Sequence, residues 1–164
     1  MAIADFYTVC GPWVHADTIA AVVAVESGGR AWAIGTPSGA IFPRTRAEAQ
    51  RVLASALRSE SSVDIGLMQI NSQWLPKLGV SAPALLDPCT NVRVGAAILA
   101  TNFVAASRPG RTHLQALVAA LSAYHSGSET AAVAYAARVA GAAIKHRSCL
   151  AIPPAKRCDR RAKS

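Results

Sequence analysis

The feature that most constrains this chain is an apolar segment that ends at a single carboxylate. The seven residues before Glu26 are all apolar, and Gly28 and Gly29 follow shortly after it. Glycine commonly ends a helix in the left-handed conformation, so the pattern predicts a helix that is capped by Asp17 or Thr18 and carries Glu26 in its last turn. At the edge of a buried helix, desolvation favours the neutral carboxyl and raises its pKa, which suits a proton donor. A glutamate that is solvated or paired with an arginine is the alternative interpretation.

Length and apolar content bound the architecture. With 164 residues, 52% of them hydrophobic, the chain fits one domain with a sizeable core, and Ala, Val and Leu recur at helical spacing. We therefore expect a mainly α fold with a small β element. Unbroken apolar runs stay far below the roughly 20 residues that cross a bilayer, so we expect no membrane span. Residues 1–17 lack the basic start and the long apolar centre of a secretory signal.

The net charge of +8 is concentrated at one end of the chain. Residues 145–164 contain seven Lys or Arg and one Asp, which supply most of the excess. We therefore divide the chain into a domain at 1–147 and a basic C-terminal tail at 148–164. Such a tail binds an acidic polymer or a partner protein, or is simply solvated. Nucleic-acid binding is not expected, because the basic residues lack interleaved aromatic residues.

Four cysteines bear on the redox environment. Cys10, Cys89, Cys149 and Cys158 allow three pairings, and no two of them have the close spacing of zinc or redox motifs. We accordingly expect no metal and no cofactor. An even count fits an oxidising compartment, with buried free thiols as the alternative.

Helix-start signals recur along the chain and predict the remaining helices. A threonine three residues before a glutamate or glutamine forms a capping box, and an aspartate before a proline caps a helix whose first residue is that proline. A last helix is expected from Ser128 to about His146. The start signals are, in order, Thr45-x-x-Glu48, Asp87-Pro88 and Thr112-x-x-Gln115, and the corresponding ends lie near Ser59, before Pro109 and at Gly127.

Two stretches between the helices do not follow helical spacing. Residues 63–71 alternate between two faces and predict a short strand or hairpin, in which Gly66 marks a bend or a close approach of the backbone to a ligand. Residues 30–44 are rich in Gly, Pro and Ser and are expected to be irregular. Trp32 and Phe42 within them are expected in the core, with sugar-stacking platforms as the alternative.

Four blocks of residues, in order along the chain, carry a resemblance to a known family. They are Glu26-Ser27-Gly28-Gly29, the run from Ser62 to Asn71 that contains Gly66-Leu67-Met68-Gln69, the run Leu86-Asp87-Pro88-Cys89-Thr90-Asn91-Val92, and the pair Ala123-Tyr124 followed by Gly127. The chain resembles the lytic transglycosylases of the lysozyme-like superfamily, most closely the small specialised ones of type IV secretion and conjugation machines. The similarity covers roughly residues 9–135. It implies a goose-type, lysozyme-like helical domain with a small β element.

The resemblance implies an enzyme that cleaves peptidoglycan between N-acetylmuramic acid and N-acetylglucosamine. In that family the glutamate that matches Glu26 is the single acid and base. It protonates the bridging oxygen and then takes a proton from the 6-hydroxyl of the muramic acid, so that a 1,6-anhydro ring closes. The residues agree independently: ordinary glycosidases need two carboxylates, and apart from the capping residue Asp87 the matched blocks offer only Asp64.

The resemblance also implies which residues line the groove. It places Gln69 in the groove and Tyr124 close to the glutamate. Met68 and Ile70 are implied to line the groove, with a core role as the alternative, and Ser27 is either a groove hydroxyl or a helix-end hydroxyl bonded to backbone. The candidate substrate-binding residues are Ser27, Asp64, Gly66, Met68, Gln69, Ile70, Asn71, Tyr124 and His125.

Two departures from the family pattern stand beside the site. Arg30-Ala31 occupies the place where the family often has Asn-Pro, and His125 replaces the usual asparagine after the tyrosine. Because histidine has an unperturbed pKa of about 6.5, His125 would make activity more dependent on pH if it contacts the sugar or the glutamate. A histidine that caps helix-end carbonyls is the alternative.

The resemblance finally bears on cysteine pairing, location and partners. The match of Cys89 to an Asp-Pro-Cys block, with Cys10 just before the first helix, predicts a Cys10 to Cys89 disulfide and leaves Cys149 to pair with Cys158. A periplasmic or otherwise extracytoplasmic monomer is implied, with glycan strands and secretion or conjugation proteins as partners. The alternatives are a hydrolytic lysozyme and a non-catalytic factor that binds the cell wall through its basic tail.

Overall fold

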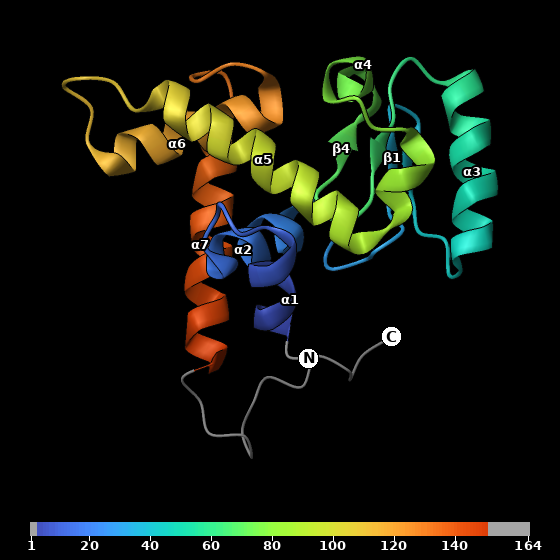
Figure 1. The fold of residues 1–164 in the computed structure, drawn as a ribbon, viewed down its shortest axis with the longest axis horizontal. Helices are drawn as coiled ribbons and strands as arrows, with labels where there is room; N and C mark the ends of the chain where they lie inside the picture. Colours follow the sequence, from blue (N-terminus) through green and yellow to red (C-terminus); the bar gives the residue numbers. More distant parts are fainter. Residues whose placement is uncertain (1–2, 151–164) are drawn as a thin grey trace.

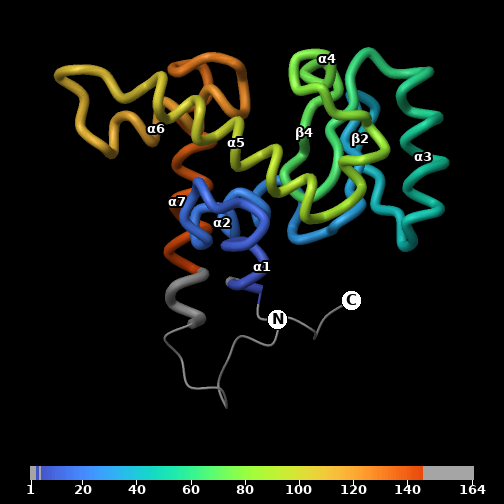
Figure 2. The backbone as a smooth tube through the Cα atoms, in the orientation of Figure 1, coloured from blue at the N-terminus to red at the C-terminus, as the bar shows by residue number. Residues whose placement is uncertain are grey.

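The structure of the protein is a computed structural model that describes residues 3–150. In this part of the chain, seven α-helices and a four-stranded sheet confirm the expected mainly α fold with a small β element. The sheet and α3 lie on one side, α6 and α7 lie on the other, and α5 runs between them (Figures 1 and 2). The helices are α1 (Ile3–Cys10), α2 (Ala16–Glu26), α3 (Arg46–Ser59), α4 (Leu75–Leu78), α5 (Pro88–Ala106), α6 (His113–Ser126) and α7 (Val133–Leu150), with short 3-10 helices η1 (Ser72–Trp74) and η2 (Ala82–Leu86).

The helix α2 carries the apolar segment that ends at Glu26. It begins after His15, whose Nδ1 accepts a hydrogen bond from the backbone N–H of Asp17 at 3.2 Å. The predicted caps Asp17 and Thr18 are therefore wrong, because the histidine ring satisfies the helix start instead. Glu26 is the last helical residue, and Gly28 follows with a φ of 61°, in the left-handed region that glycine favours.

The sheet has the strand order β2-β1-β3-β4 and is antiparallel throughout. The predicted hairpin is confirmed as β3 (Asp64–Ile65) and β4 (Ile70–Asn71). Strands β1 (Ile34–Thr36) and β2 (Gly39–Ile41) lie in a stretch that was expected to be irregular. That expectation is wrong, because strands of three residues are too short to show a period in the sequence.

The two aromatic residues of this stretch differ in burial. Trp32 packs against the core, as expected. Phe42, also expected in the core, follows β2 and is 49% exposed. The prediction for Phe42 is wrong because all three residues of β2 are exposed, so the chain leaves the sheet at its open edge.

The capping predictions are confirmed for three helices. In each, the side-chain oxygen of the capping residue accepts the backbone N–H three residues further on, which satisfies one of the unpaired donors at the helix start. The pairs are Thr45 with Glu48 at 3.2 Å, Asp87 with Thr90 at 2.8 Å and Thr112 with Gln115 at 3.2 Å.

The last helix begins later than the sequence predicts. It was expected from Ser128, and α7 starts at Val133. Before it, the carboxylate of Glu129 forms ion pairs with Arg108 and Arg111 of the loop between α5 and α6. This long-range pairing holds the segment out of the helix, and the helix then runs past residue 147, where the domain boundary was placed.

A buried asparagine ties the β3–β4 turn to the helical side of the molecule. Asn91 in α5 has no exposed surface; its Oδ1 accepts the backbone N–H of Met68 at 2.8 Å. Its Nδ2 donates to the carbonyls of Ile65 at 2.7 Å and Leu85 at 3.0 Å. Gly66 was expected to mark a bend or a close approach of the backbone to a ligand. The close approach is instead to the Asn91 side chain, since an added Cβ would lie 2.3 Å from its Nδ2.

Helix α5 is central to the packing. Val92, Ala96 and Leu99 on it are buried, and it packs against α1 and α6. Among the described residues it is the one helix long and apolar enough to cross a membrane by length and composition. Its buried face belongs to the main hydrophobic core, as is typical of the central helix of a globular domain.

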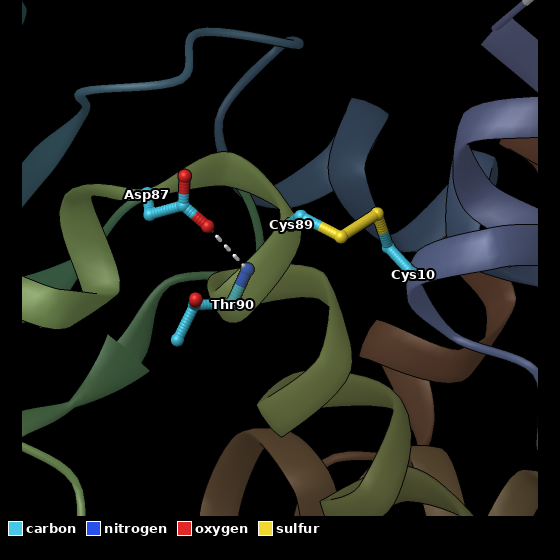
Figure 3. The surroundings of a disulfide bond; sticks show 4 residues. All are labelled: Cys10, Asp87, Cys89 and Thr90. Carbon is cyan, nitrogen blue, oxygen red and sulfur yellow. Dashed lines mark hydrogen bonds between the residues drawn. A yellow bond between two sulfur atoms is a disulfide. The ribbon is translucent and has the colours of Figure 1, made fainter.

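A disulfide joins the end of α1 to the start of α5 (Figure 3). Cys10 and Cys89 are bonded with their Cα atoms 5.1 Å apart, which confirms the predicted pairing. The sequence did not predict α1, and the bridge fixes that helix against α5. Cys149 and Cys158 lie outside the residues whose side chains the structure describes.

Removing the disulfide should lower stability substantially. The bond closes a loop with a sequence separation of 79 residues, and for loops of that length the chain-entropy cost in the unfolded state is large. We expect the double variant Cys10→Ser/Cys89→Ser to lose about 2–5 kcal/mol of unfolding free energy in urea titrations. Equal stability of the variant and the oxidised wild type would contradict the bridge.

Candidate active site

Glu26 is the candidate catalytic residue, and it ends α2 in a mostly buried position. Burial raises the pKa of its carboxyl to about 7. A hydrogen-bonding interaction with Tyr135 and the positive charge of Arg138 oppose the rise, while the nearby carboxylate of Asp64 adds to it. Because burial dominates, a substantial fraction of Glu26 is protonated at neutral pH and can donate a proton.

Two tyrosines from different helices border the carboxyl. Tyr124 of α6 donates its hydroxyl to the carbonyl of Met68 at 2.7 Å, and burial raises its pKa, with further contributions from Glu26 and Asp64. Tyr135 of α7 is 1% exposed, and its pKa is raised by burial and by Glu26. Among the residues that the structure describes, no acceptor forms a regular hydrogen bond with the buried Tyr135 hydroxyl. The Glu26 carboxyl interacts with this hydroxyl, so Glu26 is the acceptor available to it.

Asp64 supplies a second carboxyl from β3. Its Oδ1 accepts a hydrogen bond from Asn71 Nδ2 at 2.8 Å, across the β3–β4 pair. Burial raises the pKa of Asp64, while the bond from Asn71 and the charge of His125 lower it. The bond to Asn71 fixes one carboxyl oxygen, which leaves the other free to interact with groups in the site.

His125 and Arg138 lie on either side of the Tyr135 ring and complete the surroundings of the site. The His125 ring stacks on Tyr135 with centroids 4.4 Å apart and planes 4° from parallel. The guanidinium of Arg138 lies 5.4 Å from the centroid of the same tyrosine ring. Burial and then Arg138 lower the pKa of His125, against the opposing effect of Asp64, so the ring is mainly neutral at pH 7.

The turn between β3 and β4 is held in a conformation that only a few residues adopt. Gly66 has a φ of 78°, and Gln69 has a φ of 48°, which is unusual for a residue with a side chain. The Gln69 side chain offsets the cost of this backbone conformation, because its Nε2 donates to the carbonyls of Gly66 at 2.8 Å and Ala33 at 3.1 Å. The half-buried Gln69 therefore ties this turn to the start of β1.

Three of the predicted groove side chains face inward. Ser27 is 3% exposed, and its hydroxyl donates to the carbonyls of Leu67 at 2.8 Å and Val23 at 3.2 Å. Met68 and Ile70 are buried in the core. These side chains therefore stabilise the turn and the end of α2 and do not line a groove.

The structure thus brings together Glu26, Asp64, Tyr124 and His125 from the predicted set. It adds Tyr135 and Arg138, for which the sequence predicts no role in the site. Their spacing of three residues places them on one face of a helix, but the same spacing is ordinary for a core tyrosine beside a surface arginine. Only the packing of α7 against α2 shows that this face meets Glu26.

A cavity on another part of the molecule does not include this carboxyl in its lining. It has a volume of about 490 Å³ and is enclosed by α2, α5 and α6, with Trp13, Phe103 and Leu114 among its mostly apolar walls. Its lining contains no carboxylate, and its ionisable side chains are those of His15 and His113. Among the described residues, no three His, Cys, Asp or Glu side chains gather as a metal site would require.

Comparison with known proteins places the chain in a family. Residues 10–146 match the family described as transglycosylase SLT domain. "Protein virB1" of Agrobacterium fabrum is 33% identical over 128 residues, which are 77% of this chain and 52% of that protein. "Type IV secretion system protein virB1" of Brucella abortus is 35% identical over 125 residues, 74% of this chain and 52% of that protein. The chain therefore spans about half the length of these relatives, and no solved structure matches it significantly.

The raised pKa of Glu26 predicts a specific dependence of stability on pH. Its folded-state pKa of about 7 exceeds the unfolded value, so the folded state binds more protons between about pH 4.5 and 7, and stability falls as the pH rises through that window. The Glu26→Gln variant cannot lose this proton. We expect its unfolding free energy, relative to wild type, to rise by up to about 3 kcal/mol from pH 4.5 to 8 in urea titrations. A difference that stays constant with pH would show that Glu26 titrates normally.

Proposed function

The chain belongs to the transglycosylase SLT domain family, and from this premise we propose that it is a lytic transglycosylase that cleaves peptidoglycan. The bond is the β-1,4 link between N-acetylmuramic acid and N-acetylglucosamine, and the product end is a 1,6-anhydro ring. The observation that carries this proposal is the position of Glu26. It is a mostly buried carboxyl at a helix end whose pKa of about 7 supports both donating and accepting a proton.

The mechanism uses Glu26 twice. The protonated carboxyl first donates its proton to the bridging oxygen, and the bond from that oxygen to the anomeric carbon breaks. The resulting carboxylate then takes the proton of the 6-hydroxyl, whose oxygen bonds to the anomeric carbon and closes the anhydro ring. Glu26 ends in its starting form, and no water is consumed because the 6-hydroxyl oxygen of the sugar is the nucleophile.

The side chains around Glu26 contribute to this cycle in different ways. The Tyr135 hydroxyl interacts with the Glu26 carboxylate and lowers its pKa, so it stabilises the form that exists between the two proton transfers. Tyr124 is committed to the Met68 carbonyl and holds the β3–β4 turn against α6. Arg138 also favours the Glu26 carboxylate through its charge. Together Tyr135 and Arg138 keep the pKa of Glu26 near neutrality against the effect of burial.

Hydrolysis by a lysozyme mechanism is the second candidate. The observation in its favour is the electrostatic interaction between Asp64 and Glu26, because a second carboxylate could activate a water. One oxygen of Asp64 accepts the hydrogen bond from Asn71, which stabilises the carboxylate and so lowers its basicity. We therefore prefer the route without water.

Location and partners follow from the relatives and the disulfide. The name of the Brucella abortus relative refers to type IV secretion, and we propose that this chain likewise opens the cell wall for a secretion or conjugation machine. The Cys10–Cys89 bond supports a periplasmic or otherwise extracytoplasmic location, because disulfides persist in oxidising compartments. Glycan strands are the proposed partner of the domain. The basic tail lies outside the described residues, and its binding to anionic polymer stays a prediction.

Mass spectrometry of fragments released from purified peptidoglycan tests the reaction. We expect anhydro-muramic acid ends from the wild type and a loss of at least about 10²-fold in rate for Glu26→Gln, since general acid and base roles each contribute roughly that much or more. Reducing ends would favour the lysozyme mechanism, and no release would favour a binding role.

The variant Asp64→Asn serves as the matched comparison. It keeps the shape and the bond partner Asn71 but removes the second charge. The proposed route predicts that its product ends remain anhydro. Loss of activity as severe as for Glu26→Gln would show that Asp64 takes part in the chemistry.

A further inference from the structure

An exposed arginine is held in place beside the turn that follows Glu26. The Arg30 guanidinium donates from Nη1 to the carbonyl of Ser27 at 3.2 Å. It also lies over the ring of Phe42, 4.5 Å from the centroid. One contact comes from the end of α2 and the other from the residue after β2, so the side chain bridges two elements. We call Arg30 and Phe42 the Arg30–Phe42 pair.

The charge of this arginine is not balanced by a neighbouring carboxylate. In the described part of the chain, the ion pairs within 4.0 Å join His15 with Asp17 and Glu129 with Arg108 and Arg111. Arg30 is exposed and takes part in none of them. An arginine fork has five donors, and the two contacts above engage one N–H and the face of the guanidinium. Donors are thus left for an anion.

The two contacts also prepare the side chain for binding. A free arginine loses rotamer entropy when a ligand fixes it, and a planar fork already held against a ring loses less. Phe42 is 49% exposed and Ile41 before it is 42% exposed, so an apolar surface lies beside the charged group. The combination fits a ligand that carries a carboxylate next to small apolar groups.

We propose that the Arg30–Phe42 pair binds a carboxylate of the peptide stem on the muramic acid next to the cleaved bond. This inference rests on the proposed function, because the stem enters only if peptidoglycan is the substrate. The stem is attached to the same sugar whose anomeric carbon reacts, and it carries free carboxylates flanked by methyl-bearing residues. Arginine pairs with such a carboxylate through two parallel hydrogen bonds. A sugar ring stacked on Phe42 would not need the arginine charge.

Binding to two matched ligands tests the proposal without requiring turnover. Both are short synthetic glycan fragments with a stem peptide; one has free stem carboxylates and the other has them as carboxamides. In the Glu26→Gln background, which prevents cleavage, we expect the free-acid fragment to bind about tenfold more tightly than the amide, as a charge-assisted pair at an exposed site allows. Added salt should reduce that ratio, since exposed charges are screened.

Three further variants, each made in the same background, locate the effect. Arg30→Gln should bring the ratio of the two affinities, free acid over amide, close to one. Arg30→Lys should leave an intermediate ratio because it keeps the charge but not the fork. Arg51→Gln is the control: Arg51 is equally charged and exposed on α3, and its loss should leave the ratio unchanged. Thermal melting checks that each variant is folded.

The outcomes separate this inference from the proposed function. Equal affinities of Glu26→Gln for the free-acid and amide fragments would overturn the stem site. A preference for the free acid that remains after Arg30→Gln would overturn it as well. So would a failure of Glu26→Gln to bind either fragment, even if wild-type protein released anhydro ends. Conversely, discrimination that depends on Arg30 would support the site even if the wild type gave reducing ends or no product.

Discussion

The arrangement of the site depends on the burial of one amide side chain. Asn91 sits in α5 with no exposed surface, and its oxygen and nitrogen make three hydrogen bonds to backbone groups of the β3–β4 turn and η2. A buried amide without partners would be costly, so the turn can take only the position that satisfies it. That position sets the Met68 carbonyl where Tyr124 donates to it, and the sheet is thereby fixed to both α5 and α6.

The chemistry of Glu26 arises where three helices meet. α2 ends at this carboxyl, α6 contributes Tyr124 and His125, and α7 contributes the tyrosine and arginine that adjust its pKa. Burial alone would raise the pKa of Glu26 further, which favours the protonated form that donates over the carboxylate that accepts. The opposing groups of α7 bring the pKa back to about 7, and an acid that must also act as a base works best there.

The most dependable predictions from sequence were those that rest on local chemistry. Capping residues such as Thr45 and Asp87 act within one turn of helix, so a single sequence shows them directly. The start of α7 was misplaced because the ion pairs of Glu129 reach residues far away in the chain. Burial of Met68, and exposure of Phe42, likewise depend on which faces the neighbouring elements cover.

The sequence by itself determined that a helix ends at Glu26, that short strands surround Gly66, and that the matched blocks belong to a transglycosylase family. It did so because helix caps, helix-ending glycines and motifs each depend on residues that are close together in the sequence. Only the tertiary structure decided that Tyr135 and Arg138 face the carboxyl, that Ser27 bonds inward, and that Arg30 rests on Phe42. These contacts join residues distant in the chain or on separate elements, and their energies depend on burial and distance, which no local pattern encodes.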